Sequence, residues 1–152
     1  MGEKKRKLPE FLVGVISEEV YLRWLARKAM AHVKRDRKRG MSTVEGVIYR
    51  DAIHGAVLQS QGLDAYTGEQ LDWHLISQYN NDDSKEGRHH YKAGFALLPT
   101  VDHIEASSSS ASFLICAWRT NDAKNDLSHA GFIELCKRVL IHEGYRLEGP
   151  DF

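Results

Sequence analysis

The apolar residues in the first third of the chain recur every three or four positions, which is the spacing of one face of an α-helix. Ser17 precedes the first of these segments as a helix N-cap, and Gly40 follows its last apolar turn as a stop signal. Ser42 and Glu45 form a capping-box pattern before a second segment, which ends at Gly62. The pattern therefore predicts two consecutive amphipathic helices.

The period changes in the middle of the chain. Two short apolar runs, 97–104 and 113–117, flank a serine-rich stretch, and a polar segment up to Lys124 follows the second run. We expect these runs to form a β-hairpin that leads into a helix. A last helix, capped by Ser128 and ending near Gly144, is expected to pack in the core through one apolar stripe. The stripe consists of Phe132, Leu135, Cys136, Val139 and Leu140.

These elements predict an α+β fold in one domain, in which two N-terminal helices and one C-terminal helix pack around a central hairpin and helix. The length of 152 residues and the hydrophobic content of 42% suit one domain with a real core. The expected parts are a basic arm (1–16), a helical scaffold (17–62), a ββα core (63–127) and the C-terminal helix (128–144).

Composition bears on location and on redox chemistry. No apolar run has the length of a membrane span, and the lysine-rich start lacks the apolar core of a secretory signal. We therefore expect a soluble, cytoplasmic protein. Cys116 and Cys136 have no zinc-knuckle spacing and are expected to be reduced. Lone histidines are expected in solvent or at helix ends: His32, His54, His74, His129 and His142.

The net charge of zero conceals a polarised chain. Residues 1–40 hold 12 of the 21 Lys and Arg residues but only five of the 21 acids. A basic helix end beside an acidic body indicates a polyanion-binding face, and the alternative interpretation is an ordinary solvated helix end. The candidate nucleic-acid-binding residues on this helix are Lys34, Arg35, Lys38 and Arg39.

The hairpin carries the residues with the clearest chemistry. Asp102 and His103 are adjacent in its first strand, and Asn121 follows its second strand. A carboxylate and an amide oxygen are ligands that Mg²⁺ or Mn²⁺ prefers, and a histidine can take a proton from water at neutral pH. The three residue types together indicate metal-assisted hydrolysis of a phosphodiester.

The Asp102-His103 pair followed by Asn121-x-x-Lys124 resembles the HNH endonuclease motif, over residues from about 64 to 124. The resemblance implies a ββα-metal fold, with His103 activating water and with Asp102 and Asn121 binding the metal. The family's middle Asn, which orients the catalytic His, falls on Ser112. Either its hydroxyl, a shorter hydrogen-bonding arm than an amide, or the backbone carbonyl at this position is expected to hold His103.

Many members of the family also hold a structural zinc between two Cys-x-x-Cys knuckles. The knuckle positions fall on Asp64 and Thr67 before Gly68, and on Ala117 and Thr120 before Asn121. We therefore expect no structural zinc. Apolar packing is expected to fill the space instead, with Trp73, Trp118, Phe113 and Tyr66 as the candidates.

The leading hypothesis is a metal-dependent endonuclease that nicks DNA as a monomer and makes paired cuts only as a homodimer. Arg119 and Lys124 are expected to contact flanking phosphates. The competing hypothesis is a nucleic-acid-binding module on the same fold without turnover, and a third is a protein-interaction domain that does not bind DNA.

Overall fold

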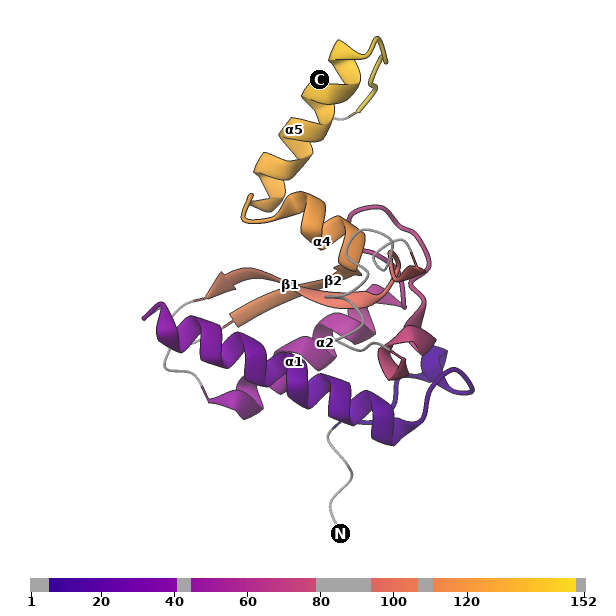
Figure 1. Ribbon diagram of the computed structural model, residues 1–152, viewed down its shortest axis with the longest axis vertical. Helices are drawn as coiled ribbons and strands as arrows, with labels where there is room; N and C mark the ends of the chain where they lie inside the picture. Colours follow the sequence, from indigo (N-terminus) through magenta and orange to yellow (C-terminus); the bar gives the residue numbers. More distant parts are fainter. Residues whose placement is uncertain (1–5, 41–44, 79–93, 107–110, 150–152) are drawn as a thin grey trace. The chain divides into compact units, whose positions relative to one another are not determined.

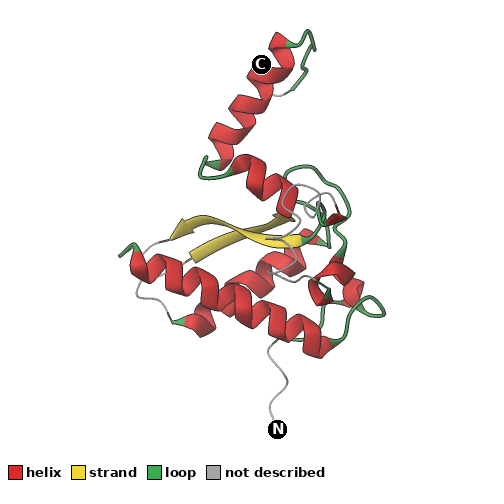
Figure 2. Cartoon of the chain, in the orientation of Figure 1, coloured by secondary structure: helices red, strands yellow, loops and turns green. Residues whose placement is uncertain are grey.

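A computed structural model describes residues 6–40, 45–78, 94–106 and 111–149. Its elements are η1 (Glu10–Leu12), α1 (Glu18–Lys38), α2 (Gly46–Ser60), η2 (Trp73–Ser77), β1 (Pro99–Ala106), β2 (Ala111–Ala117), α4 (Trp118–Lys124) and α5 (His129–His142) (Figure 1). The chain forms two compact units, residues 1–122 and 123–152. Figure 2 shows the mixture of helices with a two-stranded antiparallel sheet, which confirms the α+β class.

Both ends of α1 agree with the sequence. The Ser17 side chain accepts a hydrogen bond from the Val20 N–H at 3.1 Å, so it caps α1 as predicted. Helix α1 ends before Gly40, whose φ of 66° is the left-handed conformation that favours glycine. Helix α2 has Glu45 as its N-cap, without a side-chain cap bond, and the Ser42 half of the predicted capping box lies outside the described residues.

The segment before α1 differs from the predicted arm. Its first five residues lie outside the described part of the chain, but Leu12 in η1 is buried in the core. Leu8, Phe11 and Ile16 pack against that core. The apolar side chains that follow the basic run therefore fix residues 8–16 to the domain.

The two strands pair in antiparallel register. Asp102 lies opposite Leu114, and His103 lies opposite Phe113. A bulge follows His103, so that Ser112 pairs with Glu105. An extra residue at a bulge changes the pairing beyond it, so Ser112 lies opposite Glu105 rather than opposite Ile104.

Helices α1 and α2 cover one face of the hairpin (Figure 1). Their buried apolar side chains meet those of β1, β2 and η2 in one core. Aromatic rings lie at its centre, where Trp24 and Trp73 pack edge to face with centroids 5.5 Å apart. The hairpin is therefore held from one side by a helical layer.

Helix α5 belongs to the second unit. The Ser128 side chain accepts from the Gly131 N–H at 2.9 Å, which confirms the predicted cap. None of the residues of α5 is buried, and Leu135 and Val139 of the predicted stripe are about half exposed. The expectation that this stripe packs in the core stays a prediction, because an amphipathic pattern gives a helix but not its partner.

Candidate functional site

The pleat of β1 sends Asp102 and His103 to opposite faces. The His103 ring faces the helical layer, where its centroid lies 5.2 Å from that of Phe113 and 5.7 Å from that of His32 on α1. Asp102 accepts a hydrogen bond from the Tyr66 hydroxyl. The side chains of Asp102 and His103 therefore lie in two different environments.

His103 lies close to a carboxylate that is not among the predicted site residues. Its Nε2 lies 3.4 Å from Oδ2 of Asp36, a fully buried residue of α1. The Tyr49 hydroxyl donates to the same carboxylate oxygen at 2.5 Å. Asp36 lies one turn after His32 on the buried side of α1, so its helical position was the signal that marks it as internal.

Ser112 does not have the position expected of a residue that orients His103. Its side chain is exposed, and its partner in the register is Glu105. The structure instead brings the buried carboxylate of Asp36 to His103. The contact between Nε2 and Oδ2 is longer than a good hydrogen bond, and Nε2 has no hydrogen-bond partner in the described part of the chain.

The two predicted metal ligands lie on β1 and α4. Asp102 is buried, whereas Asn121 is half-buried. Their carboxylate and amide oxygens suit a hard cation, and the bond from Tyr66 orients the carboxylate. Burial, followed by this bond to Asp102, raises the pKa of Tyr66. Across the described ranges, no cluster of three or more His, Cys, Asp or Glu residues could hold a metal ion.

A single carboxylate joins the positions at which the HNH family places zinc ligands. Oδ1 of Asp64 accepts from the backbone N–H of Tyr66 at 2.7 Å and of Thr67 at 3.0 Å. Oδ2 accepts from the Ala117 N–H at 2.8 Å and from the Thr120 hydroxyl at 2.7 Å. We call this set of four bonds the Asp64 clamp. It fixes the turn after α2 to the junction of β2 and α4.

The clamp corrects the expectation that apolar packing takes the place of zinc. Asp64 is only 2% exposed, and its hydrogen bonds occupy both carboxylate oxygens. The candidate fillers Trp73 and Phe113 pack elsewhere in the core, against Trp24 and Tyr49 respectively. The Asp-x-x-Thr-Gly sequence is typical of a turn closed by an Asp side chain, and this was the available signal.

The basic candidates divide by exposure. The predicted phosphate-binding residues at the C-terminal end of α1 and at its C-cap are all exposed: Lys34, Arg35, Lys38 and Arg39. Arg119 is half exposed and forms an ion pair with Glu69. Lys124 is buried, so the predicted contact with a flanking phosphate does not fit its environment.

Two histidines that were expected in solvent are internal. His54 is buried and shares a 2.5 Å hydrogen bond with the Tyr21 hydroxyl. His32 lies against Phe113, with ring centroids 5.1 Å apart. The expectation was wrong because both residues lie on the core-facing sides of their helices, whose polar residues are buried with the apolar stripe.

The pKa of His32 is strongly perturbed. Burial lowers this pKa from 6.5 to about 4, and electrostatic interactions with Arg35, His103 and Lys28 act in the same direction, against an opposite effect of Asp36. The fold therefore keeps this imidazole neutral where an exposed histidine would bind a proton.

We expect this neutral histidine to make folding pH-dependent. As the pH falls below about 6.5, the unfolded chain binds a proton at His32 before the folded chain does, so the free energy of unfolding decreases until about pH 4. The loss should approach about 3 kcal/mol. Urea titrations across this range measure it. The difference in the free energy of unfolding between wild type and His32→Leu should shrink as the pH falls. The exposed His74→Gln control should show the same pH dependence as wild type. A constant difference from His32→Leu would contradict the prediction.

The chain matches no protein-family model, no curated protein and no solved structure. Within the part of the chain that the structure describes, no helix combines the length and the hydropathy needed to cross a membrane. The function must therefore be inferred from the geometry and chemistry of the site itself.

Proposed function

We propose that the protein is an HNH-type endonuclease that uses a divalent metal to hydrolyse DNA phosphodiester bonds. One observation carries the proposal: the Asp64 clamp connects the two places that zinc-containing HNH proteins connect through cysteines. A buried carboxylate with four hydrogen bonds in place of a metal keeps the turn after α2 joined to the junction of β2 and α4. This supports a ββα-metal arrangement in which the Asp102-His103 pair is functional.

His103 is the general base in this proposal. A carboxylate next to one ring nitrogen favours the tautomer that carries its proton there, which leaves the other nitrogen to accept a proton from water. Asp36, held by Tyr49, supplies that carboxylate beside Nε2. Catalytic hydrogen bonds are often long before substrate binds, so the 3.4 Å approach is compatible with this role.

Asp102 and Asn121 are the proposed ligands of one Mg²⁺ or Mn²⁺ ion. Such an ion, when bound, neutralises charge on the phosphate and on the leaving oxygen. Tyr66 orients Asp102 through its hydroxyl, which is a usual arrangement around metal-binding carboxylates. The exposed basic residues of α1 would attract the DNA backbone.

The test is incubation of supercoiled plasmid with the protein and Mg²⁺ or Mn²⁺. We expect nicked circles with either ion and none in EDTA. Asn121→Ala should weaken Mn²⁺ binding, measured by calorimetry, because it removes one of two protein ligands. The control is Asp126→Ala, which removes an exposed side chain and should leave Mn²⁺ binding unchanged. The neighbouring Asn125 is not used, because its φ of 51° lies in the left-handed region that alanine disfavours. Absence of nicking by wild-type protein would overturn the proposal.

A second candidate function is DNA binding without turnover. It is favoured by the burial of His103, whose side chain is only 13% exposed and faces the interior. This alternative predicts salt-dependent DNA binding that needs no metal and produces no nicks. The plasmid assay and a binding assay in EDTA together distinguish the two functions.

A further inference from the structure

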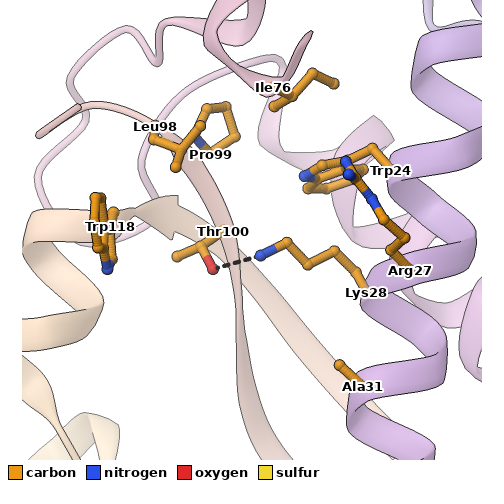
Figure 3. Close-up of a pocket in the computed structure, with 9 residues that line it drawn as sticks. All are labelled: Trp24, Arg27, Lys28, Ala31, Ile76, Leu98, Pro99, Thr100 and Trp118. Atoms are coloured by element: carbon orange, nitrogen blue, oxygen red, sulfur yellow. Dashed lines mark hydrogen bonds between the residues drawn. The ribbon is translucent and has the colours of Figure 1, made fainter. Parts of the chain in front are cut away.

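A pocket of about 350 Å³ lies between the middle of α1 and the start of β1 (Figure 3). This volume is at the lower end of the range of roughly 300–1,000 Å³ for small-ligand sites. The pocket is separate from the His103 environment, and none of the proposed catalytic or metal-binding residues lines it. It therefore needs its own explanation.

The walls of the pocket combine an aromatic ring, apolar side chains and cations. Trp118 is half-buried, and Ile76 and Pro99 add apolar surface. Lys28 reaches from α1 across the pocket and donates a hydrogen bond to the Thr100 hydroxyl at 3.2 Å, as Figure 3 shows. Such walls suit a flat, apolar ring that carries hydrogen-bonding groups and is attached to an anion.

The environment of Lys28 disfavours the charged form of its amino group. Burial, followed by the charge of Arg27, lowers its pKa from 10.5 to about 8. A nearby negative charge would offset both effects by favouring the protonated form. The pocket is therefore better suited to an anionic ligand than to a neutral or cationic one.

A stripe of positive charge continues from the pocket along α1. The stripe consists of Arg27, Lys28, Lys34, Arg35 and Lys38, which recur at helical spacing around Ala31. It is about 16 Å long. Between residues 20 and 38 the only acid is Asp36, which is fully buried. The stripe thus offers a polyanion a row of cations without a competing exposed carboxylate on this part of the helix.

We propose that the pocket accepts one unpaired nucleobase of single-stranded DNA whose phosphates follow the basic stripe. The base stacks on Trp118 and the adjacent phosphates contact Arg27 and Lys28. Cationic grooves combined with aromatic platforms are the usual means of binding single strands, because every base has a face that can stack. A paired base cannot enter, so the pocket selects single-stranded or locally opened DNA. This deepens the proposed nuclease function by naming the form of its substrate.

The test compares fluorescence anisotropy of a labelled oligothymidylate, its abasic analogue and a blunt duplex of the same length. All measurements contain EDTA, so they do not depend on cleavage. We expect wild-type protein to bind the oligothymidylate most tightly. Trp118→Leu should weaken this binding roughly 5- to 150-fold, the range for loss of one stacked base. It should leave binding of the abasic strand unchanged.

A matched pair of variants at Ala31 tests the site without altering the core. Ala31 is exposed and lines the pocket. Ala31→Glu should weaken binding of the oligothymidylate, whereas the similarly shaped Ala31→Gln should preserve it. Equal binding of oligothymidylate and abasic strand by wild type, or tighter binding of the duplex, would overturn the proposal. Base-dependent binding without plasmid nicking would support the nucleobase pocket and overturn the nuclease function. Nicking together with base-independent binding would support the nuclease function and overturn the nucleobase pocket.

Discussion

Asp64→Ala is expected to destabilise the first unit by about 3–5 kcal/mol, the scale for removing one partner of a buried charged network. The substitution leaves the N–H groups of Tyr66, Thr67 and Ala117 and the Thr120 hydroxyl without their acceptor. Such a loss is a large part of the stability of a typical domain, about 5–15 kcal/mol. The measurement is urea unfolding followed by tryptophan fluorescence.

The fluorescence signal is well suited to this question, because all three tryptophans lie in residues 1–122. Asp64→Asn should lose less stability than Asp64→Ala, since its amide keeps one acceptor oxygen. The control is Asp126→Ala, which removes an exposed carboxylate and should change the free energy of unfolding by less than about 0.5 kcal/mol. If Asp64→Ala were as stable as this control, the clamp would not be what holds the turn to β2.

His103→Ala is expected to lower the plasmid-nicking rate by about 10²- to 10⁴-fold, the usual contribution of a general base. Metal binding should persist, because the proposed ligands are Asp102 and Asn121. Initial rates of nicking at saturating Mn²⁺ give the size of the effect. Equal nicking by His103→Ala and wild type would show that another group activates water.

Asp36→Asn separates the orientation of His103 from its chemistry. The amide retains the size of the side chain and an acceptor for Tyr49 but removes the carboxylate beside Nε2. We therefore expect a nicking rate between those of wild type and His103→Ala, with a shifted pH profile. The exposed His74→Ala should nick like wild type and controls for the general loss of an imidazole.

The sequence predicted the local elements well where side chains act on their own backbone. Ser17 and Ser128 cap the helices that they were expected to begin, because a cap needs only a hydroxyl and nearby N–H groups. The hairpin was also predictable, since two apolar runs flanking a polar stretch have few other ways to pair.

The partners of the candidate site were less predictable. His103 and Asp36 are far apart in the chain, and their contact depends on how α1 packs against β1. The role of Asp64 likewise depends on the approach of β2 to the turn after α2. Which Asp side chains are buried and hydrogen-bonded is decided only when the neighbouring elements pack around them.

The sequence by itself determined the α+β class, the starts of α1 and α5 and the hairpin, because these follow from hydrophobic period and capping chemistry. Only the tertiary structure decided that Asp102 and His103 face different partners and that the buried carboxylate of Asp64 joins the turn after α2 to the junction of β2 and α4. These outcomes depend on long-range packing, which local residue preferences do not encode.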